Sequence, residues 1–262
     1  MHNLYIGTQG FSFKDWVGPF YPSSGPPSRF LLDYSRYFRT VEIDSTFYGI
    51  PKRATIAAWR QRTPAGFRFS AKFPNSITHQ KMLVDCDAAT QHFIATMRGL
   101  GDRLGPLLLQ FSYEFGPERS ESLVRYLDGL PEDLQFAVEV RNRDWYDTDI
   151  IEMLQARDVA LVLHDLYYMP RHTEVTADFV YIRWLGRRTD LEQFDRIQLD
   201  RRDEEGWWAE HVLSFLERGL TVFGYFNNLW AGYSPGSALG FLERLGYPVE
   251  PLDSEPQQPR LF

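Results

Sequence analysis

Eight short apolar segments with β-strand character recur along the chain, and this repetition limits the fold more than any other feature. They alternate with segments of helical character, and each ends in polar or glycine-rich sequence. The segments span residues 4–8, 40–44, 67–72, 106–111, 134–140, 159–164, 179–184 and 220–226. Strand–helix alternation repeated in this way is typical of a parallel sheet closed as a (β/α)₈ barrel. We therefore predict an α/β fold built as a single TIM-like barrel.

The segments between the strands show helical spacing of apolar residues or helix start and stop residues. They predict helices over residues 30–38, 51–62, 87–104, 118–130, 149–157, 203–218 and 237–245. Residues 165–177, between the sixth and seventh strands, contain a proline and little helical periodicity, so we expect an irregular loop over the barrel mouth there. A doubly wound open sheet is the alternative fold, although no Gly-x-Gly-x-x-Gly sequence follows an early strand.

The composition fits one large domain. Hydrophobic residues make up 44% of the 262 residues, which is enough for a large buried core. A chain of this length is compatible with one barrel as well as with two smaller domains. We expect the barrel over residues 1–247 and a proline-rich, extended C-terminal tail over residues 248–262.

The net charge, the cysteine content and the lack of targeting segments limit which partners and which location we expect. The net charge of −7 argues against a basic surface for bulk nucleic-acid binding but leaves room for a local basic pocket. Cys86 is the single cysteine and cannot form an internal disulfide. The N-terminus enters a strand almost at once, which leaves no room for a signal peptide, and no apolar run is long enough to span a bilayer. We expect a cytoplasmic protein without a membrane partner.

Charged and amide residues gather where the predicted strands end. Glu42 and Asp44 share one face of the second strand because side chains alternate along a strand. In a barrel the carboxyl ends of all strands meet at one face, where barrel enzymes place their active sites. Further candidates at this face are Lys72, His79, Gln110, Glu139, Arg141, His164, Arg183, Asn227 and Asn228.

These residue types fit an anion-binding site with acid–base chemistry. Lys72, Arg141 and Arg183 would bind a phosphate or carboxylate group, which the planar guanidinium of arginine recognises well. Glu139 or Glu42 would then act as general acid or base, with a pKa set by the neighbouring cations. We place His164 with these two carboxylates among the catalytic candidates.

Two other interpretations stay open. Glu42, Asp44, Glu139 and His164 would suit a divalent metal ion that activates water, although no metal-binding spacing occurs and the nearby cations oppose an ion; we predict no cofactor otherwise. In the structural interpretation, Glu42 pairs with Lys72 or Arg141, and Glu139 with Arg141, as ion pairs without catalysis. His164 would then be a core histidine, and Asn227 and Asn228 would hold a turn.

Residues 10–27 form a long loop rich in aromatic residues, glycine and proline after the first strand. Such loops often carry function on a rigid scaffold. Trp16 is our candidate here for stacking against a ligand, whereas Phe13 and Phe20 are expected to pack as a cover for the barrel.

The chain resembles the domain-of-unknown-function family 72, the YecE-like proteins, over nearly its whole length. The matching segments are residues 7–12 (GTQGFS), 42–48 (EIDSTFY), 69–72 (FSAK), 139–141 (EVR) and 225–228 (YFNN). The chain has Gln9 where serine is common in the family and Asp44 where asparagine is frequent. The resemblance implies a TIM-like barrel and no established reaction. We include Tyr48, in the second matching segment, among the ligand-binding candidates.

The last residues carry a separate signal. Residues 258–262 (QPRLF) are similar to the short peptides with which bacterial repair and replication proteins dock on the sliding clamp. An extended tail would present Leu261 and Phe262 to an apolar pocket, while Gln258 fixes the register. The alternative is that the Leu-Phe end packs on the chain's own barrel.

Our leading functional hypothesis is a hydrolase or lyase that acts on an anionic, phosphate-bearing ligand at the barrel mouth. The ligand would be a small molecule or a nucleic-acid fragment. The competing hypothesis is a non-catalytic ligand-binding or DNA-repair accessory protein that docks on the sliding clamp through its tail.

Overall fold

The structure is a computed structural model that describes residues 3–187 and 191–249. Its strands are β1 (Leu4–Thr8), β2 (Thr40–Ile43), β3 (Arg68–Lys72), β4 (Leu104–Gln110), β5 (Phe136–Glu139), β6 (Ala160–Leu161), β7 (Leu163–Leu166), β8 (Phe179–Gly186) and β9 (Thr221–Phe226). All hydrogen-bonded pairs among these strands are parallel. They form two sheets, ordered β1-β9-β8-β7 and β2-β3-β4-β5-β6.

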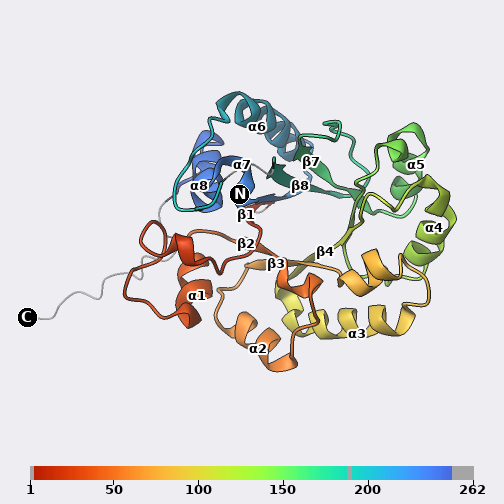
Figure 1. The fold of residues 1–262 in the computed structure, drawn as a ribbon, viewed down its shortest axis with the longest axis horizontal. Helices are drawn as coiled ribbons and strands as arrows, with labels where there is room; N and C mark the ends of the chain where they lie inside the picture. The colour runs from red at the N-terminus through yellow and green to blue at the C-terminus, as the bar shows by residue number, and fades with distance from the viewer. Residues whose placement is uncertain (1–2, 188–190, 250–262) are drawn as a thin grey trace, which may run out of the picture.

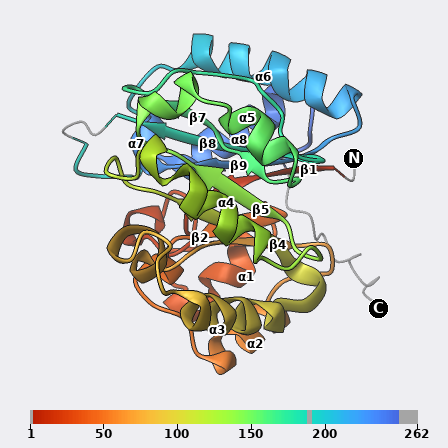
Figure 2. The same ribbon diagram turned by 90° about the vertical axis from the view of Figure 1, so that its right-hand side faces the viewer.

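Helices surround the two sheets. They are α1 (Phe30–Tyr34), α2 (Arg53–Gln61), α3 (Asp87–Met97), α4 (Ser120–Asp128), α5 (Ile150–Gln155), α6 (Arg202–Glu217), α7 (Asn228–Ala231) and α8 (Ser234–Arg244). Figure 1 shows α1 to α6 following one another around the strands. Figure 2 shows α6 over the sheet that contains β7 to β9, with α1 to α3 on the opposite side of the molecule. No helix among residues 3–187 and 191–249 combines the length and apolar character needed to cross a membrane.

The two sheets meet at two places. Between β1 and β2, the Gly10 N–H donates to the Glu42 carbonyl at 2.8 Å. The Tyr34 hydroxyl accepts from the Thr8 N–H at 2.9 Å and donates to the Thr40 carbonyl at 3.0 Å. At the other meeting place β6 and β7 belong to one continuous segment, with Val162 between them.

The predicted α/β class and the parallel strands are confirmed, but a continuously closed (β/α)₈ barrel is not. Within the described residues the regular ladders stop between β1 and β2 and between β6 and β7, so two sheets replace the single closed one. The sixth predicted strand, residues 159–164, is accordingly split in two. Residues 167–178, all of them described, contain no helix, as the proline and the weak periodicity predicted.

The interior faces of the strands are layered along the strand direction. Every second residue of β8 faces the interior, in the order Phe179, Tyr181 and Arg183. Phe179 and Tyr181 belong to a buried apolar cluster with Leu108 of β4 and Phe223 of β9, so the cluster joins both sheets. Arg183 lies one step further toward the carboxyl ends, where charged residues follow the apolar layer. A larger apolar core joins the opposite faces of the strands to the helices.

Candidate functional site

Three charged side chains at the carboxyl ends of β2, β5 and β8 form the centre of the candidate site. Arg183 donates through one terminal nitrogen to Glu42 Oε1 at 2.7 Å and through the other to Glu139 Oε2 at 2.5 Å. Both carboxylates are fully buried, and the arginine is almost fully buried. The period-two alternation that places Tyr181 in the apolar layer also places Arg183 here. One guanidinium from the four-stranded sheet therefore pairs with two carboxylates that both come from the five-stranded sheet.

The remaining oxygens of the two carboxylates have their own partners. The Tyr181 hydroxyl donates to Glu42 Oε2 at 2.7 Å. Arg141 donates to Glu139 Oε1 and also reaches the Tyr168 hydroxyl at 3.1 Å. The structure thus contains the expected Glu139–Arg141 pair, whereas the partner of Glu42 is Arg183 rather than Lys72 or Arg141.

The two carboxyl groups differ in pKa because they face different charges. Burial raises the pKa of Glu42 to about 7, and the neighbouring Asp44 adds to this rise, while Arg183 opposes it. Burial also raises the pKa of Glu139, but Arg141 and Arg183 together outweigh it and lower the pKa to about 2. At neutral pH Glu139 is a permanent anion, and Glu42 is poised to gain or lose a proton.

Asp44 lies at the outer edge of this centre. Its carboxylate is 3.8 Å from Arg183, and 37% of its side chain is exposed. Arg141 is also partly exposed, at 18% of its side chain. These two residues are thus the partly exposed members of a cluster that is otherwise buried.

Lys72 lies beside the buried charges at the end of β3. Its ammonium donates to Gln110 Oε1 at 3.0 Å and lies 4.1 Å from the centre of the Phe47 ring. Burial lowers the pKa of Lys72. His79 packs edge-on against the same Phe47 ring, with 4.9 Å between ring centres, and burial together with Lys72 lowers its pKa. The structure thus brings Lys72 and His79 together on one side of the mouth.

His164 lies at the level of Arg183 on the neighbouring strand, and it is fully buried. The Tyr146 hydroxyl approaches its Nε2 at 3.5 Å. Burial lowers the pKa of His164, although Glu139 favours the protonated form. His172, in the loop after β7, packs at a right angle to His164 with 6.1 Å between ring centres. The neutral imidazole of His164 is therefore a neighbour of the Glu139–Arg141 pair.

Sequence reasoning missed Tyr181, Tyr146 and His172. Tyr181 could have been predicted from the period-two pattern, since it precedes Arg183 by two residues and lies on the same strand face. Tyr146 and His172 come from the segments after β5 and β7, where no periodicity indicates which way a side chain points.

Four predicted ligand-binding residues lie outside the charged cluster: Trp16, Tyr48, Asn227 and Asn228. Trp16 is fully buried, and its indole N–H donates to Asn228 Oδ1 at 3.3 Å, so it belongs to the core. Asn228 Oδ1 also accepts from the Ser234 N–H at 3.0 Å. Asn227 accepts from the Leu229 N–H at 2.8 Å and caps α7. These contacts agree with the turn-holding interpretation of both asparagines.

Asn227 nevertheless keeps one link to the mouth. Its amide donates to Gln9 Oε1 at 2.8 Å, and Gln9 lies beside Glu42 in an isolated parallel bridge. Tyr48, by contrast, is 82% exposed and packs only edge-on against Phe47. It therefore lies outside the buried centre, at the rim.

The described residues do not support the predicted alternative of a divalent metal site. In the described part of the chain no three His, Cys, Asp or Glu side chains come close enough together to hold a metal ion. Three of the four suggested ligands, Glu42, Asp44 and Glu139, lie around the cation of Arg183 instead, and His164 faces Arg183 on the neighbouring strand. The charge balance among these side chains is thus already provided by an arginine.

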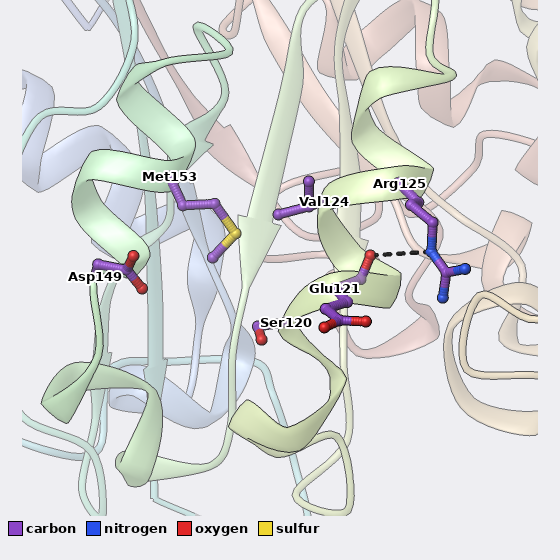
Figure 3. A pocket seen from close by; sticks show the side chains of 6 residues that line it. All are labelled: Ser120, Glu121, Val124, Arg125, Asp149 and Met153. Carbon is purple, nitrogen blue, oxygen red and sulfur yellow. Dashed lines mark hydrogen bonds between the residues drawn. The ribbon is translucent and has the colours of Figure 1, made fainter.

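A pocket of about 410 Å³ lies elsewhere, between α4 and α5. Figure 3 shows the side chains that line it, which are Ser120, Glu121, Val124, Arg125, Asp149 and Met153. Its single marked hydrogen bond joins Arg125 to the Glu121 carbonyl within α4 at 3.3 Å. The charged groups do not converge on a common point, so we assign no site there. The predicted clamp-binding residues Gln258, Leu261 and Phe262 lie outside the described residues.

Comparison with other proteins places the chain in a family. A crystal structure of a DUF72 family protein from Thermotoga maritima is similar to it, with a TM-score of 0.79 and 30% identity over 93% of this chain and 99% of that one. A crystal structure of D-psicose 3-epimerase, in the presence of D-fructose, has a TM-score of 0.51 and 10% identity over 92% of this chain and 94% of that one, and it is similar in fold alone.

The sequence comparisons agree. The UPF0759 protein YecE of Escherichia coli K12 is 36% identical over 143 residues, which are 55% of this chain and 50% of the relative. The matched part of the chain thus spans about half the length of that relative. The model of the family described as "Protein of unknown function DUF72" matches residues 5–261. The chain belongs to the DUF72 family.

Proposed function

We propose that the cluster of Glu42, Arg183 and Glu139 is the active site of an enzyme, a hydrolase or lyase that acts on a small anionic ligand. One observation carries this proposal. Two fully buried carboxyl groups share one arginine, and their pKa values lie on opposite sides of the ordinary value, at about 7 and about 2. Pairs of titratable groups pushed apart in this way are typical of acid–base catalysis.

Each carboxyl group then has a distinct role. Glu42, with a pKa near neutral pH, donates and accepts the proton, since the best general acid or base has a pKa close to the working pH. Glu139 stays ionised and holds Arg183 and Arg141 in position. The Tyr181 hydroxyl, which donates to Glu42 at 2.7 Å, orients the reacting carboxyl group.

The anion would bind to Lys72 and Arg141. Both terminal nitrogens of Arg183 are engaged by Glu42 and Glu139, so Arg183 contributes its positive charge to the site rather than a free pair of donors for the anion. Arg141 is partly exposed. The Lys72 ammonium donates to a neutral group, the amide oxygen of Gln110. Both cations therefore keep charge that a phosphate group can use.

The position of the cluster also supports the proposal. We infer that the two sheets are two parts of one TIM-like barrel wall, joined through the Tyr34 hydroxyl and through Val162. The charged cluster then lies at the carboxyl ends of the strands, the face at which barrel enzymes carry their active sites.

Substitution of Glu42 by Gln tests the proposal. A thermal-shift screen of wild type and Glu42→Gln would use inorganic phosphate, sugar phosphates, nucleotides and short DNA, each with and without Mg²⁺. A ligand at a hundredfold excess over its dissociation constant stabilises the folded state by about 2.7 kcal/mol. We expect a phosphate compound to stabilise both proteins, and Glu42→Gln to lose turnover of that compound by about a hundredfold or more.

The exposed Glu118 provides the control, since Glu118→Gln should keep both binding and turnover. Glu139→Gln is a less informative variant because it leaves Arg183 and Arg141 without their shared anion and destabilises the fold by about 3–5 kcal/mol. Binding by both wild type and Glu42→Gln without turnover by either would support a non-catalytic binding protein. No stabilisation by any phosphate compound would refute the anion site.

A further inference from the structure

A second group of polar side chains lies next to the Glu139–Arg141 pair. It comprises Tyr146, His164 and His172, which we call the histidine cluster. The Tyr146 hydroxyl is 3.5 Å from His164 Nε2, and the Tyr146 and His172 rings are 5.1 Å apart between centres. The three residues come from the short 3-10 helix Arg143–Asp147 after β5, from β7 and from the loop after β7.

Three of the four imidazole nitrogens of the histidine cluster are buried without the partners that buried polar atoms normally have. His164 Nδ1 has no hydrogen-bond partner among the described residues, and His164 itself is fully buried. In this part of the chain Nδ1 and Nε2 of His172 also lack a partner of good hydrogen-bond geometry, although a backbone hydrogen bond with Val162 raises the pKa of that ring. Buried polar atoms without partners are rare in folded proteins and call for an explanation.

The protonation state of the two imidazoles indicates which chemical class of ligand can pair with them. Burial lowers the pKa of both rings, to about 4 for His172, so both imidazoles are neutral at pH 7. A neutral imidazole offers one donor and one acceptor. A hydroxyl group also combines a donor and an acceptor, so it satisfies such a ring in either tautomer. A carboxylate or phosphate only accepts, and it leaves the acceptor nitrogens of both rings unpaired.

A metal ion fits the cluster poorly. The described residues offer no set of three metal-binding side chains here, and Arg141 and Arg183 lie close to His164 and lower its pKa by repelling a second positive charge. A neutral polar ligand carries neither difficulty.

We propose that the histidine cluster is a subsite for hydroxyl groups, and that the substrate is a polyhydroxylated phosphate, of the sugar phosphate or polyol phosphate class. This inference rests on the proposed function, because the phosphate group occupies Lys72 and Arg141. The hydroxyl groups then pair with Tyr146, His164 and His172 on the other side of Arg141. Glu42 pairs with the terminal nitrogen of Arg183 that does not contact Glu139, and there it exchanges the proton.

The loop of residues 167–178 carries His172 and contacts the anion-binding side of the cluster. Tyr168 ties the loop to the mouth, since its hydroxyl accepts from Arg141 at 3.1 Å and its carbonyl accepts from Arg143 at 2.5 Å. An anion that binds Arg141 competes with the Tyr168 hydroxyl. Phosphate binding and movement of the loop that carries His172 are therefore coupled through the Arg141 guanidinium.

Calorimetric titration of four probes tests the subsite. The probes are inorganic phosphate, propyl phosphate, ribose 5-phosphate and free ribose. For wild type we expect ribose 5-phosphate to bind about tenfold or more tighter than propyl phosphate, because each hydroxyl hydrogen bond contributes a factor of a few. Tyr146→Phe and His172→Ala should each reduce this ratio toward one and leave the affinity for propyl phosphate unchanged.

His92, an exposed histidine on α3, provides the matched control, and His92→Ala should keep the ratio of wild type. Tyr146→Phe retains the ring and removes only the hydroxyl, so it stays informative if His172→Ala does not fold. Equal affinity of wild type for the two phosphate esters, or a ratio unchanged in both variants, would overturn the subsite.

The probes also separate the two proposals. Binding of inorganic phosphate without any preference for ribose 5-phosphate would refute the subsite and keep the anion site. Binding of free ribose without binding of any phosphate would refute the anion site and keep the hydroxyl subsite. No binding of any of the four probes would refute both.

Discussion

At the scale of single residues, Arg183 joins two carboxyl groups that have opposite tendencies. Glu139 faces a second cation, Arg141, while Glu42 faces a second anion, Asp44. The same buried environment therefore favours the ionised form at one position and the protonated form at the other. Two chemically similar side chains acquire different roles from their neighbours.

The raised pKa of Glu42 predicts a pH-dependent contribution to stability. A carboxyl group whose pKa is raised from 4.5 to about 7 on folding stabilises the folded state below the unfolded value and loses that contribution as pH rises through 7. Wild type should lose about 3 kcal/mol of stability relative to Glu42→Gln between pH 4.5 and pH 8. Urea unfolding of both proteins across this range measures the difference.

Glu139 is present in both proteins, so its opposite contribution cancels in this comparison. Glu118→Gln, which alters an exposed carboxylate, should track wild type at every pH. A stability difference between wild type and Glu42→Gln that stays constant with pH would contradict the raised pKa.

At the scale of elements, the contact between β1 and β2 depends on close backbone approach instead of a regular ladder. A Cβ atom at Gly7 would overlap the Thr40 carbonyl oxygen and lie 2.8 Å from the Tyr34 hydroxyl. That hydroxyl is the group that links the two strands. Glycine at position 7 is therefore required by the distance between the two sheets.

Substitution of Gly7 by Ala should separate β1 from β2 and reduce stability by about 2 kcal/mol or more, as overpacking of a tight interior does. Gly240 is the matched control. It lies within α8 with no atom within 4 Å of an added Cβ, so Gly240→Ala should stabilise the helix by about 0.5–1 kcal/mol. Urea unfolding measures both. Equal effects of the two substitutions would show that the contact between β1 and β2 does not need this glycine.

At the scale of the whole molecule, the residues of the candidate site all lie between Gln9 and Asn227. Tyr247 still packs against the larger core, close to the end of the described chain. The described helices and strands and the candidate site thus lie within residues 3–249. The domain division at residue 247 stays a prediction.

A chain that ends at residue 249 should unfold at the same temperature as the full chain, within about 2 °C, since a loss of 1 kcal/mol shifts the midpoint of a domain of this size by about 2–4 °C. Thermal unfolding of the two chains measures this. A large loss of stability would show that the tail packs on the barrel. Retention of the bacterial sliding clamp by the full chain and not by the shortened one would support the clamp-docking hypothesis.

Much of the fold was predictable because its signals are local. The eight predicted strand segments all contain strands, and Asp203–Arg218 differs from α6 by one residue at each end. The position of the polar residues was predictable for the same reason, since a strand with alternating faces puts Tyr181 and Arg183 on one side. The interruptions of the sheet at Val162 and between β1 and β2 were not predictable, since closure depends on distances between strands that are remote in sequence.

The sequence by itself determined which elements form and which charged residues stand at their carboxyl ends, because both follow from periodicity over a few neighbouring residues. Only the tertiary structure decided the pairing. Glu42 and Arg183 are separated by 141 residues and lie in different sheets, and the choice of Arg183 over Lys72 as partner depends on how those sheets meet. The division of the two carboxyl groups into a proton carrier and a fixed anion follows from that pairing, since a pKa in a buried site depends on which charges lie within a few ångströms.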